Sequence, residues 1–99
     1  MGAPRPKPER LAEKLLQIRT SLGISQTELH RRLGAEDLVE YHIISRYERG
    51  TREPPLMILL EYARLANVYV EALIDDAVDL PDKLPSPKKS EGVRSRKRR

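Results

Sequence analysis

Few side chains in this sequence have both the type and the spacing that catalysis or metal binding requires. The chain contains two histidines, His30 and His42, and no cysteine. The lack of cysteine excludes disulfides, thiolate catalysis and cysteine-based zinc sites. Asp75 and Asp76 are adjacent, and adjacent side chains on a helix diverge by about 100°, so they do not form an acid–base pair. We therefore expect no enzyme activity, no metal and no cofactor, and we expect His30 to be an ordinary surface residue.

Arginine carries the remaining recognisable chemistry. Two groups of arginines stand out near the middle of the chain, Arg31 with Arg32, and Arg46 with Arg49 and Arg52. A guanidinium group binds phosphate, and it also matches the acceptor edge of guanine with two parallel hydrogen bonds. Residue type alone does not separate such contacts from an ordinary solvated surface, so both interpretations stand at this point.

The net charge of +4 is unevenly distributed. Residues 83–99 hold eight basic side chains against one acidic side chain, a net of +7, whereas residues 55–82 have a net charge of −5. The segment that follows Asp79 is so polar that it buries too little apolar surface to offset the entropy lost on ordering. We therefore expect a disordered Pro/Lys/Arg-rich tail over 79–99. Its charge suits phosphate groups or an acidic protein surface, and the sequence does not choose between them.

The helices expected in the first part of the chain are short. An apolar stripe at i, i+4, i+7 and i+11 is made of Leu11, Leu15, Ile18 and Leu22. It predicts a helix that has Pro8 in its first turn and ends at Gly23. A second helix over 25–33 has Ser25 as N-cap, with Glu28 three residues later, which is the pattern of a capping box.

Three more helices are expected after Gly34. The third runs from about 40 to 49 and ends at Gly50, and the fourth spans 56–66 and ends at Asn67. The expected core positions of the fourth helix are Leu56, Leu59, Leu60, Ala63 and Ala66. A short fifth helix over about 70–78 supplies Leu73 and Ile74.

These elements indicate one small all-α domain. We expect a compact five-helix fold over 8–78, preceded by an N-terminal arm at 1–7. No segment approaches the roughly 18–20 apolar residues that span a bilayer. The N-terminus, MGAPRPKPER, has no apolar core of a secretory signal. The expected location is the cytoplasm, without membrane contact.

Two stretches of the sequence resemble a known family. GISQTELHRRLG (23–34) and IISRYERGTREPPLMILLEYARLANV (43–68) are similar to the Cro/CI-type helix-turn-helix regulators, also called the xenobiotic-response-element type. The resemblance covers about residues 9–76. The matching positions before the fourth helix are Gly23, Gln26, Leu29, Leu33, Gly34, Ile44, Ser45, Tyr47, Glu48, Gly50, Arg52, Glu53 and Pro54. The resemblance implies a repressor-like domain that binds double-stranded DNA in a sequence-specific way, as a homodimer, with the helix at 40–49 in the major groove.

The resemblance also implies roles for individual residues. Gln26 matches a glutamine that holds a backbone phosphate, and Arg52 matches a second backbone contact. Tyr41, His42 and Arg46 fall at positions that face base edges, and Arg46 is the best candidate for a guanine contact. The full expected DNA-binding set is Gln26, Thr27, Tyr41, His42, Ser45, Arg46, Arg49 and Arg52.

The sequence also matches an ion pair of the family, and it departs from the family in two places. Arg19 and Glu48 match an arginine and a glutamate that pair between the first and third helices and fix their angle. The interval from Gly34 to Ser45 is 11 residues, where the family pattern usually has seven. The longer turn either adds a contact or shifts the register of the third helix. Tyr69 stands where the family usually has a capping serine or threonine.

Apolar residues of the fourth and fifth helices leave the choice of partner open. Met57 and Ile58 occupy positions that related sequences usually leave polar. They either pack under the loop at 35–41, or form a dimer patch together with Tyr69 and Val70. Such a patch also suits an alternative function, in which an antitoxin-like or protein-interaction module binds a partner protein through the fourth helix and the tail. Non-specific binding of RNA or anionic membrane would require the tail alone.

Overall fold

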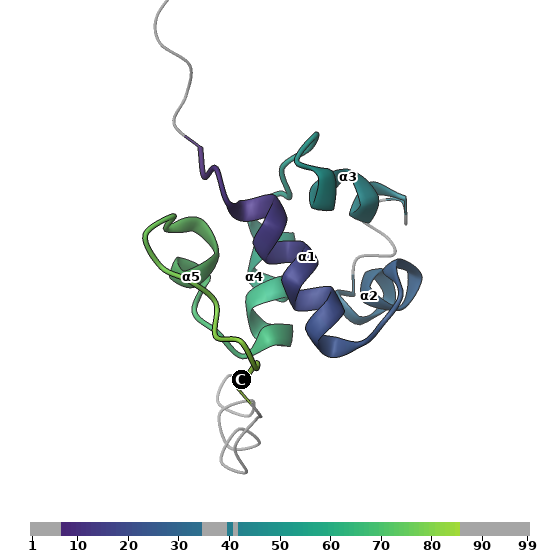
Figure 1. The fold of residues 1–99 in the computed structure, drawn as a ribbon. Coiled ribbons are helices and arrows are strands. Elements are labelled where there is room, and N and C mark those ends of the chain that lie inside the picture. The colour runs from purple at the N-terminus through teal and green to yellow at the C-terminus, as the bar shows by residue number, and fades with distance from the viewer. Residues whose placement is uncertain (1–6, 35–39, 41, 86–99) are drawn as a thin grey trace, which may run out of the picture.

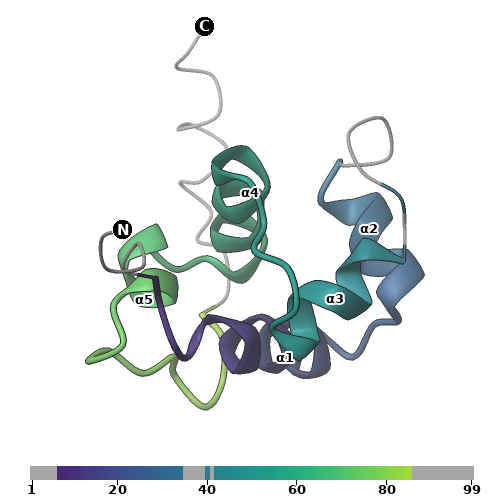
Figure 2. The same ribbon diagram turned by 90° about the horizontal axis from the view of Figure 1, so that it is seen from above.

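The computed structural model describes residues 7–34, 40 and 42–85. This part of the chain contains five α-helices, namely α1 (Leu11–Leu22), α2 (Gln26–Arg32), α3 (Ile43–Arg49), α4 (Leu56–Ala66) and α5 (Val70–Ile74). Helix α1 crosses the middle of the molecule, with α2 and α3 on one side of it and α5 on the other (Figures 1 and 2). The predicted all-α, five-helix fold is confirmed. Most of the predicted arm (1–7) and the basic part of the predicted tail lie outside the described residues.

The core is assembled around α1. Helix α1 packs against α3, α4 and α5, while α2 packs against α3 and α4 packs against α5. The largest fully buried side chains come from all five helices and comprise Lys14, Leu15, Ile18, Leu29, Ile44, Tyr47, Ile58, Tyr62 and Leu73. Burying one large apolar side chain stabilises the fold by about 1.5–3 kcal/mol. A small domain with four aromatic residues therefore depends on each of these positions.

Left-handed residues end α3 and α4 abruptly. Gly50 follows α3 with φ 79°, and its N–H donates to the carbonyl of Tyr47 at 3.2 Å. A Cβ at Gly50 would lie 3.4 Å from the Cβ of Ala12, so this turn also passes close to α1. Asn67 follows α4 with φ 61°, and asparagine tolerates this conformation better than most residues. Both helix ends agree with the sequence prediction, and α3 remains a rod of only seven residues.

Three predicted helix boundaries were wrong. Helix α1 begins at Leu11, so Pro8 precedes it instead of lying in its first turn. Helix α3 begins at Ile43, three residues later than expected, with His42 as its N-cap residue, and the N–H of Ile43 donates to the carbonyl of Glu40 at 3.0 Å. Helix α5 ends at Ile74 and not near 78, since Asp75 adopts an extended conformation (φ −91°, ψ 109°). The chain after Asp75 turns back toward α1 and forms polar contacts that a continued helix would prevent.

The predicted interior was wrong at several positions. On α4, Leu59, Ala63 and Ala66 are buried as predicted, but Ile58 and Tyr62 complete the buried face, whereas Leu56 is 81% exposed and Leu60 is half-buried. On α5, Ile74 was expected inside and is 45% exposed. His30, expected at the surface, is buried at the end of α2. Leu80, assigned to the tail, is buried in the core, so the folded domain extends beyond residue 78.

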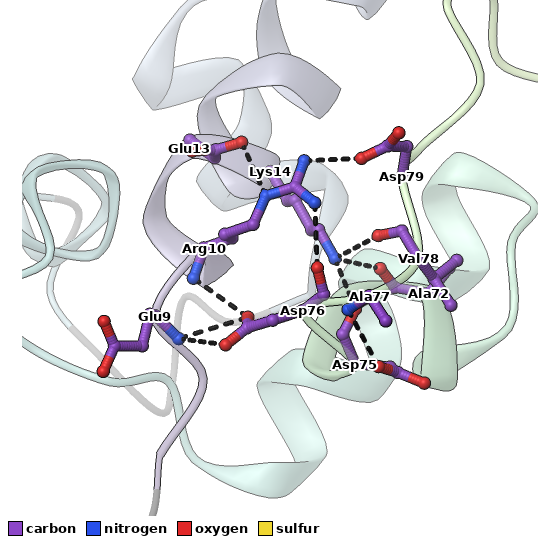
Figure 3. A network of polar contacts seen from close by, with 10 residues as sticks. All are labelled: Glu9, Arg10, Glu13, Lys14, Ala72, Asp75, Asp76, Ala77, Val78 and Asp79. Carbon is purple, nitrogen blue, oxygen red and sulfur yellow. Dashed lines mark hydrogen bonds and ion pairs between the residues drawn. The ribbon is translucent and has the colours of Figure 1, made fainter.

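A buried lysine joins α1 to the end of α5. Lys14 is fully buried, and its Nζ donates to the carbonyl oxygens of Ala72 and Asp75 at 2.9 Å and to that of Val78 at 2.6 Å (Figure 3). An ammonium group has three N–H donors, and here each has a carbonyl partner. The charge also lies at the C-terminal end of a helix, where a cation is favoured. Lys14 therefore takes the place of a continued fifth helix as the partner of these carbonyls.

A carboxylate makes the reciprocal contact at the start of α1. Asp76 accepts hydrogen bonds from the backbone N–H of Glu9 at 2.9 Å and of Arg10 at 3.1 Å (Figure 3). These two bonds lower the pKa of Asp76. The guanidinium of Arg10 donates to the carbonyl of Asp76 at 2.9 Å and pairs with Asp79 at 2.8 Å. We call the set of Arg10, Lys14 and Asp76 the α1–α5 clasp.

Candidate nucleic-acid interface

Helices α2 and α3 form a short pair with one buried and one exposed side. Ser25 caps α2, since its Oγ accepts the backbone N–H of Glu28 at 3.0 Å. On α3, Ile44 and Tyr47 are buried, and they turn the opposite side of the helix outward. The residues exposed there are His42, Arg46 and Arg49, and Arg52 is exposed just after the turn. Only Ile44 and Tyr47 of α3 are buried, and they lie on one side of the helix. The four exposed residues therefore share the opposite side.

The arginines of the two helices differ in their partners. On α2, Glu28 pairs with Arg31 and also with Arg32, whose Nε lies 2.8 Å from a carboxylate oxygen. The hydrogen bonds from Arg31, followed by those from Arg32, lower the pKa of Glu28. Arg46, Arg49 and Arg52 form no ion pair with any acidic side chain in the described part of the chain. Positive charge available for a ligand is therefore concentrated on α3 and the turn that follows it.

A nearly buried carboxylate connects α1, α2 and α3. Glu48 accepts from Arg19 through Nε at 2.6 Å and through Nη2 at 3.1 Å, and from Nε2 of Gln26 at 3.0 Å. The side chain of Glu48 is 5% exposed and that of Arg19 is 20% exposed. The hydrogen bonds to Glu48 raise the pKa of Arg19, which keeps this cation charged. One carboxylate thus fixes the start of α2 and the exposed side of α3 relative to the central helix.

This geometry consists of two short helices packed against each other, with the second helix outward and basic. The comparison with protein families agrees, because the helix-turn-helix family HTH_3 matches residues 15–73, more than half of the chain. The chain belongs to the Cro/CI-type helix-turn-helix family. No curated protein and no solved structure matched it significantly. The Cro/CI-type domain is a DNA-binding domain, so α2 and α3 are the elements that bear the DNA-binding surface.

The structure places the remaining expected contacts of the Cro/CI-type domain around these two helices. Thr27 is exposed on the first turn of α2, and Ser45 is half-buried on α3. Gln26 gives one amide N–H to Glu48, and its NH₂ group has a second N–H that suits a phosphate oxygen. Tyr41 lies outside the described residues. His42 is the N-cap residue of α3 and not a residue of its first turn, because the helix begins later than expected.

Sequence reasoning missed an acidic residue beside these arginines. Glu40 pairs with His42, with 2.9 Å between Oε1 of Glu40 and Nε2 of His42. A shallow groove of about 310 Å³ is lined by both of these residues together with Arg46 and Arg52. The only signal in the sequence was the i, i+2 spacing of Glu40 and His42, which identifies a pair only once the backbone turn is known.

The expected dimer patch was partly wrong. Ile58 is a core residue, so it contributes nothing to a surface. Val70 is half-buried against the core, whereas Met57 is 62% exposed and Tyr69 is 86% exposed. Leu56, which was expected in the core, is instead one of the most exposed apolar side chains. The apolar surface of α4 therefore lies one residue earlier in the sequence than predicted.

The described residues contain neither a membrane-spanning helix nor a cluster of metal-binding side chains. No helix there combines the length and apolar character needed to cross a membrane. Within the same ranges, no three or more histidine, cysteine, aspartate or glutamate side chains gather as they would around a metal ion.

Proposed function

We propose that this Cro/CI-type protein is a transcriptional regulator, acting as a repressor, that recognises a specific DNA sequence by inserting α3 into the major groove. The observation that carries the proposal is the exposed side of α3, where Arg46 and Arg49 have no acidic partner in the described part of the chain. The major groove is about 12 Å wide and admits one α-helix. Helix α3 has only seven residues and ends at a left-handed glycine. No further helical turn therefore stands beyond it to block its exposed side chains.

The proposed contacts divide into two classes. Arg46 and His42 lie one helical turn apart at the exposed start and middle of α3, and we assign them to base edges. Gln26, Thr27 and Arg52 lie at the borders of this surface, and we assign them to phosphates. Phosphate contacts fix register and orientation, while base contacts supply specificity. Ser45 and Arg49 belong to the same surface and complete the proposed set, and Tyr41 remains a proposed base contact.

We further propose that the protein binds as a homodimer through an apolar surface made of Leu56, Met57 and Ile74. Leu56 and Ile74 line one shallow hollow together with the edge of Leu59. Leu56 and Ile74 are both exposed at this hollow, and Met57 is exposed next to Leu56 in the sequence of α4, which favours a protein contact. A twofold dimer would place two α3 helices about 34–36 Å apart on successive turns of DNA.

The dimer has a direct test with a matched control. Leu56→Glu introduces a charge into the proposed interface, and we expect it to convert the dimer to a monomer in sedimentation experiments. Leu16→Glu changes an exposed leucine of α1 in the same way and is expected to leave the dimer intact. A wild-type protein that is monomeric at all concentrations, with or without DNA, would refute the dimer and would favour a different protein partner for this surface.

The experiment that tests the function is selection of bound fragments from random DNA at about 150 mM salt, near physiological ionic strength. We expect a defined motif with twofold symmetry. The matched control is a variant in which Arg46, Arg49 and Arg52 are all alanine, which should remain folded and select no motif because these side chains are exposed. A wild-type protein that enriches no sequence, or a triple variant that enriches the same motif, would contradict the proposal.

A further inference from the structure

The groove beside α3 has an acidic edge. Glu40, His42, Arg46, Arg52 and Glu53 all line it, so both signs of charge occur within about 310 Å³. A surface whose only task was to neutralise phosphates would have no use for a carboxylate there, because like charges repel DNA and lower its affinity. The acidic edge therefore indicates that this groove also contacts a chemical group other than phosphate.

The backbone and one neighbouring side chain fix the position of Glu40. Its carbonyl accepts the backbone N–H of Ile43 at 3.0 Å, which places Glu40 in the turn that leads directly into α3. Its carboxylate Oε1 lies 2.9 Å from Nε2 of His42, and the side chain is still 78% exposed. His42 and Arg46 are four residues apart and therefore share one face of the helix. The carboxylate is thus held on the same exposed side as the guanidinium of Arg46.

The chemistry of the major groove limits what such a carboxylate contacts. An ionised carboxylate only accepts hydrogen bonds. The edge of guanine presents two acceptors in the major groove, while cytosine presents the N4 amino group as a donor. A carboxylate near these edges gains a hydrogen bond from cytosine and is repelled by guanine. The hydrogen bond with cytosine and the repulsion from guanine both favour cytosine over guanine.

We propose that Glu40 is a specificity-determining residue that selects cytosine at a base position next to the guanine read by Arg46, and that His42, in addition to its proposed contact with a base edge, positions the carboxylate of Glu40. This inference rests on the proposed function, since it requires α3 to lie in the major groove. It adds an acidic group to a surface for which the sequence predicted no acidic contact.

The test compares the DNA motifs selected by the wild-type protein and by four variants, namely E40A, E40Q, H42A and H42Q. Wild-type protein should prefer cytosine at one position by roughly fivefold or more. E40A should lose this preference, keep the guanine preference of Arg46, and bind unrelated DNA more tightly because a negative charge is gone. E40Q should move the preference toward adenine, which glutamine recognises. D82N, which removes a charge from an exposed residue outside the groove, is the matched control and should leave the motif unchanged.

The histidine variants separate positioning from a plain structural role. H42A should weaken the cytosine preference, and H42Q, which retains a donor for the carboxylate, should restore part of it. A loss of affinity that is equal for all sequences in H42A would overturn the positioning role. If the E40A motif equals that of the wild type, Glu40 reads no base and the proposal fails while the proposed function survives. If the wild-type protein selects no motif at all, the proposed function itself has failed.

Discussion

Arg19 and Glu48 join α1 to α3 through two hydrogen bonds of 2.6 and 3.1 Å, on a carboxylate that is 5% exposed. The same carboxylate also holds Gln26, so the orientation of the proposed DNA-binding surface depends on this one side chain. Removing one partner of a nearly buried ion pair leaves the other charge buried without a partner. The resulting loss in the free energy of unfolding is larger than the stability that an exposed ion pair contributes.

The first prediction follows from this pair. Glu48→Gln should destabilise the protein by about 2–4 kcal/mol, because Arg19 would keep its charge in a mostly buried site without a carboxylate. Combining Glu48→Gln with Arg19→Met in a double-mutant cycle should give an interaction energy of about 1–3 kcal/mol in urea denaturation. If the two substitutions are additive, the two side chains do not stabilise each other.

A second prediction concerns the buried end of Lys14. Lys14→Met preserves most of the side-chain volume but leaves the carbonyls of Ala72, Asp75 and Val78 without their donor. We expect a loss of about 2–4 kcal/mol in the free energy of unfolding, since unpaired buried polar groups are costly. The control is Lys7→Met, an exposed position, which should change stability by less than about 0.5 kcal/mol. Equal effects at both positions would show that the clasp contributes nothing to stability.

The third prediction is a pH dependence that arises from Asp76. The N–H groups of Glu9 and Arg10 hold its pKa below the ordinary value in the folded state. A group with a lowered folded-state pKa stabilises the protein above its unfolded pKa, about 3.9, and this stability is lost as the pH falls further. Asp76→Asn should therefore be less stable than the wild type near neutral pH, and the difference should shrink below about pH 4.

The check on this pH dependence is a series of thermal melts between about pH 2 and 7. Asp82→Asn serves as the control, because Asp82 is exposed and lies outside the clasp. A difference between wild type and Asp76→Asn that stays constant over the whole range would mean that ionisation of Asp76 does not stabilise the fold.

A fourth prediction concerns Tyr62. Its ring is fully buried, and its hydroxyl has no hydrogen-bond partner in the described part of the chain. Burial raises the pKa of this hydroxyl, so it stays protonated. Tyr62→Phe should leave the stability unchanged or raise it by up to about 1 kcal/mol, while Tyr62→Leu should lower it by about 2 kcal/mol or more because the ring fills the core. A clear loss of stability in Tyr62→Phe would reveal a hydrogen bond of the hydroxyl.

The sequence predicted the number of helices and the ends of α1, α3 and α4 because these depend on local chemistry. Gly23, Gly50 and Asn67 provide the left-handed residues, and each was recognisable from its type and place. The start of α3 was not predictable in this way, because the longer turn before it contains no distinct cap. The end of α5 depends on Lys14, whose distance in sequence from its carbonyl partners is 58–64 residues.

The site was predictable only in part, for a related reason. Arg46 and Arg52 stand in a motif with fixed spacing, so their exposure followed from the buried positions of the motif, Ile44 and Tyr47. The resemblance predicted the pair of Arg19 and Glu48, which the structure contains. Gln26 as the second partner of Glu48 and the groove position of Glu40 depend on how the helices meet, which periodicity does not encode. On α4, helical spacing placed Leu59, Ala63 and Ala66 inside correctly, but it did not show that Ile58 and Tyr62, and not Leu56, complete the buried face.

The most direct test of the account is the effect of Arg46→Ala on binding to the selected DNA motif. Titrations at about 150 mM salt should compare the motif with duplexes altered at each base pair in turn. We predict a loss of roughly 1–3 kcal/mol on the motif, together with a lost preference at one guanine position and unchanged preferences elsewhere. An equal loss of affinity for every duplex would contradict the claim that α3 reads bases through Arg46.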